Sequence, residues 1–225
     1  MADYETTLKQ KQAELIRKSL EGSVFLDTDL SATSVITSLT ADSVGTPGTP
    51  ELQALPGTYE DLGWLSTDGA QFSRDVSTSE VNSWGSVSPT RTDITADTTT
   101  MSVTAHETKL LTIGLGTGID LSAVTPDATT GEFSVAKPAR PKPRHYRVLS
   151  LAVDVSDGGE IYIARFLPRA KVTGFAEQAF GGGDDPITWG VTFTAEEDSD
   201  LGFTERWFFA GAGWKALLAD MGFGA

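Results

Sequence analysis

Apolar and polar residues alternate with a period of two in three separate stretches of this 225-residue chain. The clearest runs from residue 187 to 194, where Ile, Trp, Val and Phe occupy every second position, and the others cover 100–105 and 149–155. This alternation is typical of extended strands that bury one face. The composition agrees, because 29 Thr and 19 Ser favour strands and polar turns, while 23 Gly and 10 Pro indicate many turns. The chain is therefore expected to be mainly β.

Two of these stretches also predict how strands are connected. Residues 149–155 and 161–167 flank Asp157-Gly158-Gly159, which predicts a hairpin. Ile94 and Ala96 lie on the opposite parity from Met101 and Val103, so the strand must change register, and we expect a bulge or turn at 97–99. Residues 203–209 are expected to form the last strand.

Short helices are predicted at the beginning, the middle and the end of the chain. Residues 3–22 carry a moderate apolar stripe and end at Gly22, a residue type typical of helix termini. Residues 107–115 have leucines at helical spacing and are followed by glycines at 116 and 118. Trp214, Leu217, Leu218 and Met221 follow the i, i+3, i+4, i+7 spacing of a short amphipathic helix.

The pattern is weak between residues 23 and 57, where 33–40 resembles a strand and 45–50 an open loop. Long connections of this kind are usually functional or mobile, so we interpret 23–57 as an arm or interface loop that becomes ordered in a polymer. The chain is accordingly divided into residues 1–57, an N-terminal helix with an arm or loop, and residues 58–225, a β domain.

Charge is segregated along the sequence. The whole chain carries a net charge of −14, yet residues 137–171 hold eight basic and three acidic residues, a local charge of +5. The acidic balance argues against a protein that coats nucleic acid with a basic face. A basic segment on an acidic body instead favours contact with another copy, with Arg140, Lys142, Arg144 and Arg147 as candidate contacts, and a solvated basic loop is the alternative.

No constellation of residues supports catalysis, a metal or a cofactor. The chain has no Cys, which excludes thiol catalysis and disulfides, and its two histidines, His106 and His145, are interpreted as surface or satisfied groups. The glycines of residues 114–118 lack the spacing and the lysine of a phosphate loop. Asp184-Asp185 and the acidic run 196–200 are expected to be solvated loops, with a hydrolytic carboxylate pair at Asp184 or weak calcium binding as the less favoured readings.

The tryptophans carry more information than the histidines. Trp189 and Trp214 are expected in the core, whereas Trp64, Trp84 and Trp207 could stack sugars or be buried between subunits. No run of about 18 apolar residues is present and the first 20 residues have no apolar signal segment, so we expect neither a membrane span nor export.

Two groups of sequence stretches resemble the major tail, or tail tube, proteins of long-tailed phages that infect actinobacteria. The first begins with Tyr-Glu-Asp-Leu-Gly-Trp-Leu-Ser-Thr-Asp-Gly at 59–69 and continues at 84–85, 89–94 and 107–109. The second comprises 146–148, 161–163, 165–168 and 171–172. The resemblance implies a β-sandwich or barrel-like subunit and no catalytic residues.

The resemblance also implies partners and a location. Hexameric rings would stack head to tail into a tube in the virion tail, assembled in the host cytoplasm, through which the DNA genome passes without specific binding. Tape measure, tail terminator and tail tip proteins would be further partners. Trp84 joins the four basic residues as a candidate contact between subunits, and a carbohydrate-binding β-sandwich of a phage particle is kept as the alternative function.

Overall fold

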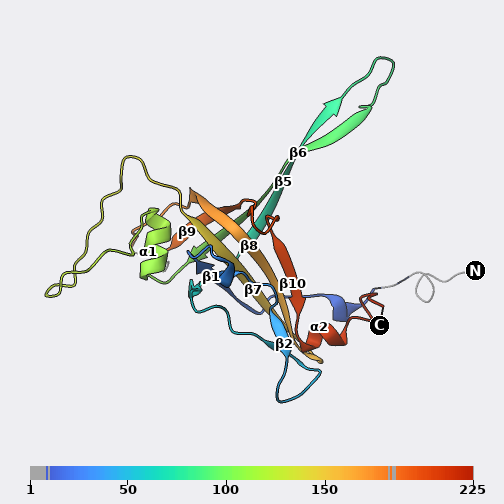
Figure 1. Ribbon diagram of the computed structural model, residues 1–225, viewed down its shortest axis with the longest axis horizontal. Helices are drawn as coiled ribbons and strands as arrows, with labels where there is room; N and C mark the ends of the chain where they lie inside the picture. Colours follow the sequence, from blue (N-terminus) through green and yellow to red (C-terminus); the bar gives the residue numbers. More distant parts are fainter. Residues whose placement is uncertain (1–8, 10, 182, 184–185, 225) are drawn as a thin grey trace, which may run out of the picture.

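One antiparallel sheet organises the computed structural model, which describes residues 9, 11–181, 183 and 186–224 (Figure 1). Its strands follow the order β4-β1-β7-β8-β9-β6-β5, and β10 pairs with β8 off this path. The strands are β1 (Glu21–Asp27), β4 (Glu60–Asp61), β5 (Gln71–Val81), β6 (Arg91–Ala105), β7 (His145–Ser156), β8 (Gly159–Phe175), β9 (Trp189–Ala195) and β10 (Arg206–Ala210). A separate hairpin pairs β2 (Thr40–Asp42) with β3 (Pro50–Leu52).

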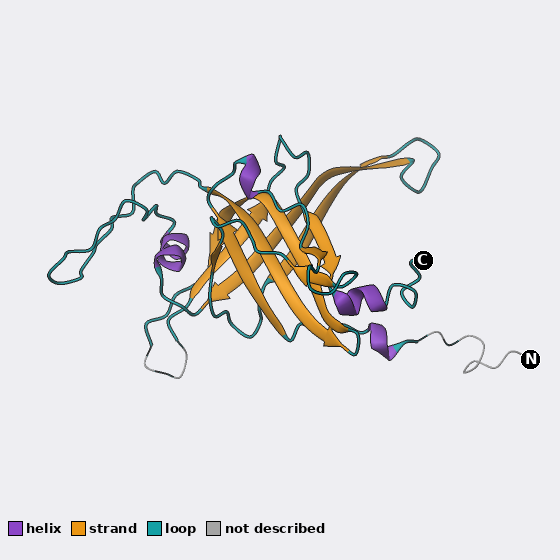
Figure 2. Ribbon diagram, turned by 60° about the horizontal axis from the view of Figure 1, so that its bottom comes forward, coloured by secondary structure: helices purple, strands orange, loops and turns teal. Residues whose placement is uncertain are grey.

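Residues 60–66 join the two sides of the main sheet. At one end Leu62 N–H donates to Val24 O of β1 at 2.9 Å, and at the other end Ser66 N–H donates to Thr104 O of β6 at 2.9 Å. Leu65 also forms an isolated bridge with Ala105. The sheet consequently curls around on itself like a barrel (Figure 2), which removes most of its free edges.

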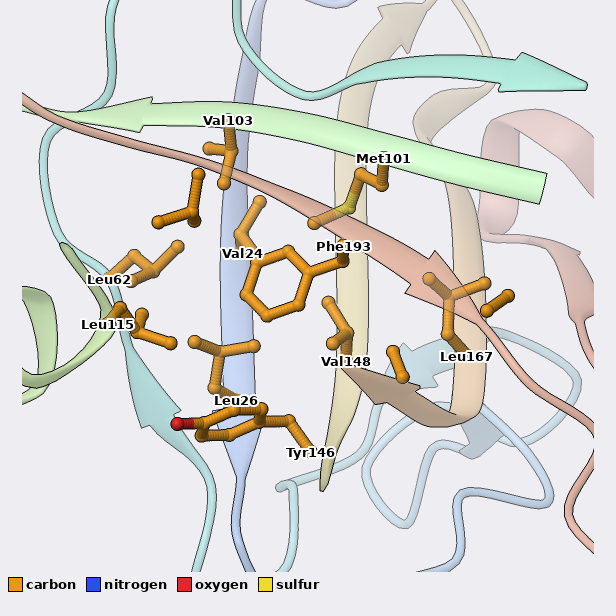
Figure 3. Close-up of a cluster of buried hydrophobic side chains, with 13 residues drawn as sticks. Val24, Leu26, Leu62, Met101, Val103, Leu115, Tyr146, Val148, Leu167 and Phe193 are labelled. Atoms are coloured by element: carbon orange, nitrogen blue, oxygen red, sulfur yellow. The ribbon is translucent and has the colours of Figure 1, made fainter. Parts of the chain in front are cut away.

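The inside of the curled sheet is filled by an inner cluster of apolar side chains from β1, β6, β7, β8, β9 and α1 (Leu110–Thr117) (Figure 3). Met101, Val148, Leu167 and Phe193 have no exposed surface, and Tyr146 meets Phe193 edge to face at 6.0 Å. Burying each such side chain stabilises the fold by about 1.5–3 kcal/mol.

An outer cluster lies on the other face of β7 and β8. Leu149 and Phe166 are fully buried there against Ile36 and Leu39, and Phe208 of β10 packs on the same cluster. The segment between β1 and β4 therefore covers the sheet from outside. This explains why β7 and β8 are apolar on both faces near their middle.

The strands predicted at 100–105, 149–155, 161–167 and 187–194 are confirmed, with β9 beginning only at Trp189, whereas the last strand, predicted at 203–209, is β10 at Arg206–Ala210. The hairpin turns at the predicted Asp157-Gly158-Gly159, β9 carries the alternating face of Val191 and Phe193, and Met101, Val103 and Ala105 are buried together. The register change in β6 exists, but Thr95 is the unpaired residue, so the expected position at 97–99 is wrong by two residues. Ile94 is 67% exposed, so packing in a core does not determine which face of the strand it lies on.

The N-terminal helix prediction is wrong where the structure describes it. Ala13–Leu15 form only a 3₁₀ turn, and Ile16 and Leu20 remain exposed because no surface of the chain covers them. Residues 1–8 and 10 lie outside the described residues. Gly22 lies inside β1, where a Cβ would come within 2.6 Å of Leu151 O, so this glycine permits close strand pairing and does not end a helix.

The segment 23–57 is also more ordered than an arm. β1 sits between β4 and β7, with Val24 and Leu26 in the inner cluster, and the strand expected at 33–40 is instead a 3₁₀ turn, Ala32–Ser34, followed by coil. Residues 43–49 connect β2 to β3, so the loop predicted at 45–50 is confirmed except at Pro50, which begins β3. The division of the chain at residue 57 stays a prediction, with β1 on its N-terminal side belonging to the main sheet.

The other two helices are present but short. α1 ends at Gly118 in the left-handed conformation, while Gly114 lies within it. The C-terminal helix α2 (Ala212–Ala216) covers only the first turn of the predicted stripe. No helix in the described ranges is long and apolar enough to cross a membrane.

Candidate intersubunit surfaces

A long two-stranded ribbon leaves the body of the protein (Figure 1, green). It consists of the distal parts of β5 and β6 and the turn at residues 82–90, and nearly all its side chains are exposed. Ion pairs Arg74–Asp97 and Arg91–Asp93 lie along it, and the bidentate contact of Arg74 lowers the pKa of the Asp97 carboxyl. Isolated two-stranded hairpins are only marginally stable in water, so an exposed ribbon of this length is a candidate contact surface.

Apolar side chains mark the tip of the ribbon. Trp84 and Val87 are fully exposed, and residues 81–90 contain no charged side chain although the chain carries a net charge of −14. Large exposed apolar groups at a projecting tip indicate an interaction site. The structure thus puts Trp84, one of the sequence-predicted contacts, where a neighbouring molecule can reach it.

The basic residues of the predicted site are divided between two environments. Arg140 and Lys142 are exposed in the loop of residues 118–144, which lies between α1 and β7. Arg144 is partly buried, 3.2 Å from Asp120, and its guanidinium lies 5.7 Å from the Tyr146 ring centroid. Hydrogen bonds from Ser122, aided by Arg144, lower the pKa of the Asp120 carboxyl.

Arg147 does not belong with them. Its side chain is 2% exposed, and its guanidinium donates to Leu30 O, Ser31 O and Ser34 Oγ while lying 3.9 Å from Asp198. It therefore holds the 30–34 turn against β7 from inside the protein. We remove Arg147 from the candidate intersubunit contacts, because a contact residue must be accessible.

Two acids of the run at 196–200, Glu196 and Asp198, make internal contacts, whereas Glu197 and Asp200 are exposed as expected of a solvated loop. Glu196 pairs with Lys171, with His145 at 3.0 Å and with Arg169 at 3.7 Å, and the hydrogen bond from Lys171 lowers the pKa of the Glu196 carboxyl. Asp198 accepts from the backbone N–H groups of residues 200 and 201. Among the described residues no cluster of three or more candidate ligands could hold a metal ion, and Asp184-Asp185 lies outside them.

An arginine sandwich at the root of the ribbon was not visible in the sequence. The Arg165 guanidinium of β8 lies 3.7 Å from the Phe72 ring centroid and 4.1 Å from the Trp207 ring centroid, and it pairs with Glu205. Thr99 of β6 donates to the same carboxylate at 3.3 Å. The contacts connect β5, β6, β8 and β10, so they set the direction in which the ribbon leaves the body.

β10 presents an aromatic row beside an unpaired edge. Trp207, Phe209 and Trp214 stack in sequence with ring centroids 6.0 and 5.0 Å apart, and Trp207 and Phe209 are nearly half exposed. In the described part of the chain β10 pairs with β8 alone. Trp214 and Trp189 are half-buried at the margins of the fold, so the prediction that both are core residues is wrong.

Comparisons with known proteins give a family match and a distant structural match. The family model described as phage tail tube protein matches residues 23–209. The chain belongs to that family. A solved chain from the virion of a native gene transfer agent particle is 10% identical, with 70% of this chain and 92% of that chain covered at a TM-score of 0.31. No curated protein matches the chain.

Family membership makes the chain a structural tail protein of a phage virion, as the sequence resemblance implied, while a host among the actinobacteria stays a prediction. The carbohydrate-binding alternative gains no support from the geometry. Trp64 lies on the segment that closes the barrel and Trp84 at the ribbon tip, and neither takes part in the ring stacking found among the described residues.

Proposed function

We propose that copies of this chain form hexameric rings that stack head to tail into the phage tail tube, the conduit for genome ejection. The observation that carries the proposal is the ribbon of β5 and β6, which extends from the body with both faces exposed and an apolar, uncharged tip. A tube needs contacts that close into a ring and axial contacts that repeat without closing. A projecting ribbon supplies a contact of the second kind.

The free edge of β10 supports the contacts within a ring. Its backbone groups can pair with a strand of a neighbouring copy, and the row of Trp207, Phe209 and Trp214 offers an apolar surface beside it. Aromatic side chains of this kind dominate the energetics of protein interfaces.

The net charge of −14 suits a tube that conducts DNA. Acidic walls repel phosphates, so the genome would slide, whereas a basic wall would bind it by counterion release. The axial joints would then combine the ribbon with the exposed cations Arg140 and Lys142. Tape measure, tail terminator and tail tip proteins are the further partners in this proposal, and assembly would take place in the host cytoplasm.

Negative-stain electron microscopy and light scattering of the purified chain test the proposal. Rings or tubes are expected, with assembly increasing with protein concentration. A particle that stays monomeric at high concentration, even when a tail extract is added to seed assembly, would contradict it.

Charge reversal tests the basic segment separately. Arg140→Glu with Lys142→Glu should slow stacking and change its dependence on salt, because Coulomb attraction is screened beyond about 8–10 Å at ordinary ionic strength. The control, Arg140→Lys with Lys142→Arg, keeps the charge and should stack normally. Equal stacking by both double variants would place the basic segment away from any joint.

A further inference from the structure

A pocket of about 240 Å³ opens where the loop of residues 118–144 returns to the body. Its apolar lining comes from Leu115 of α1, Tyr146 of β7, and Val172 and Phe175 of β8. Lys142 and Arg144 stand on its rim. An apolar pocket with a few polar groups at its edge is the usual form of a binding site for a single anchoring group.

The chemistry of the pocket favours a flat aromatic ring. Arg144 already lies over the Tyr146 ring, and Phe175, which is 54% exposed, adds a second aromatic wall. A tryptophan indole buries roughly 150–250 Å² and binds best where a cation can lie on its face. Acidic or phosphorylated groups would gain the cations but would lose hydration against the apolar walls.

The chain itself carries a side chain of this kind. Trp84 is fully exposed at the ribbon tip, and no charge at residues 81–90 hinders its entry into an apolar site. Residues 71–105 hold two basic and four acidic side chains, a net charge of −2, while residues 137–144 hold four basic and no acidic ones. The segment that carries the indole and the segment that borders the pocket are therefore complementary in charge.

The two features lie on opposite sides of the body. The ribbon and the loop of residues 118–144 project away from each other in both views (Figures 1 and 2), so Trp84 and the pocket are separated within one chain. A projection on one side and a receptor on the other form a heterologous contact, which repeats from copy to copy without closing. We propose that the pocket bordered by Lys142 and Arg144 receives the Trp84 indole of a second copy. This inference rests on the assembly proposed above.

Cysteine cross-linking tests the contact directly, because the natural chain has no Cys. Ser83→Cys protein, which keeps the neighbouring Trp84 indole, and Lys142→Cys protein are assembled together, the tubes are checked by microscopy, and the mixture is oxidised. A cross-linked dimer is expected between the two variants, since a disulfide forms only when Cα atoms come within about 7 Å. The control replaces Lys142→Cys with Val44→Cys, an equally accessible position on the β2–β3 turn, and should give no such dimer.

Removing the Trp84 indole provides a second test. Trp84→Ala should raise the protein concentration needed for tubes at least about tenfold, as expected for an interface anchor, whereas Trp64→Ala, which removes another exposed indole, should leave it unchanged. Tubes that form without the specific cross-link, or that tolerate Trp84→Ala, would overturn the pocket assignment and leave the tube proposal standing. Failure of the unmodified chain to assemble under any condition would overturn the tube proposal itself.

Discussion

Two long antiparallel hairpins of this molecule have the same topology but differ in how far they are buried. β7 and β8 are buried on both faces near their middle, by the inner cluster on one side and the outer cluster on the other. β5 and β6 pair over a similar length, but the ribbon beyond the barrel is exposed on both faces. Hydrogen-bonded pairing is equally complete in both, so burial is what distinguishes them.

The difference separates the stability of the chain from the assembly proposed above. β7 and β8 supply apolar residues to two cores, whereas the ribbon is rich in Thr, Ser and Asp and has its most exposed apolar side chains, Trp84 and Val87, at the tip. Because the ribbon has few apolar side chains to bury, leaving it in water costs little free energy, and its surface remains available to a partner. The body can therefore tolerate changes in the ribbon, and assembly can depend on them.

Removing a core side chain from β8 should have the largest effect. Phe166 is fully buried in the outer cluster, and Phe166→Ala should lower the free energy of unfolding by about 3–5 kcal/mol through lost burial and a cavity. Ile94→Ala on the ribbon should change it by less than about 0.5 kcal/mol, because Ile94 is largely exposed. Urea unfolding measures both. Similar losses in the two variants would mean that the ribbon is buried in the free subunit.

Arg144 and Arg147, three residues apart, allow the same comparison between an exposed and a buried side chain. Arg147→Ala removes the guanidinium donor to Leu30 O and to the buried Ser34 Oγ, which should cost about 1–3 kcal/mol in the free energy of unfolding. Arg144→Ala removes a partly exposed pair with Asp120 and should cost at most about 1 kcal/mol. Denaturant midpoints at neutral pH give the comparison. An equal cost in the two variants would contradict the buried position of Arg147.

The sequence predicts the strands that alternate and misses those determined by tertiary contacts. β9 and the hairpin of β7 and β8 follow from period two because one face of each meets a core. β1 carries Val24 and Leu26 in alternation within only seven residues, a signal too short to separate from the polar residues around it. The supposed helix before it fails in its described part, where Ile16 and Leu20 of the apolar stripe are exposed.

The candidate surfaces were predictable in part for a similar reason. The local charge of +5 singles out residues 137–171 as a basic segment with Arg140, Lys142 and Arg144 among its candidate contacts, and Trp84 was expected to contact a sugar or another subunit. Nothing local distinguishes Arg147 from Arg144, since burial depends on the 30–34 turn, more than 110 residues away in the chain. The Arg165 sandwich joins residues from three distant stretches and has no sequence pattern at all.

Loosening the root of the ribbon should have a smaller effect. Arg165→Lys keeps the charge near Glu205 but loses the planar stacking on Phe72 and Trp207, at a cost of about 1 kcal/mol. Hydrogen exchange should accelerate where β5 and β6 enter the barrel and stay unchanged in the middle of β7. Uniform acceleration across both hairpins would show that the sandwich stabilises the whole barrel and does not act on the ribbon alone.

The smallest expected effect is a difference in how the stability of a body variant and of a ribbon variant depends on pH. Lys171, with His145 and Arg169 nearby, holds the pKa of the Glu196 carboxyl below its ordinary value of 4.5. Because the folded pKa is lowered, the stabilisation by Glu196 is fully present above pH 4.5 and disappears as the pH falls through the lowered value. Glu196→Gln should therefore be less stable than the unmodified chain near neutral pH, by at most about 1 kcal/mol, and equal to it in acid.

The Asp97 carboxyl on the ribbon also has a lowered pKa, through its contact with Arg74, but it is solvent-exposed. Asp97→Asn should accordingly show a weaker pH dependence than Glu196→Gln, because water and salt screen an ion pair that no core surrounds. Urea unfolding of the three proteins between pH 3 and pH 7 measures the two differences on one scale. A larger difference for Asp97→Asn would mean that the ribbon, and not the barrel end at Glu196, shields its ion pairs better, which would reverse the contrast between the two hairpins.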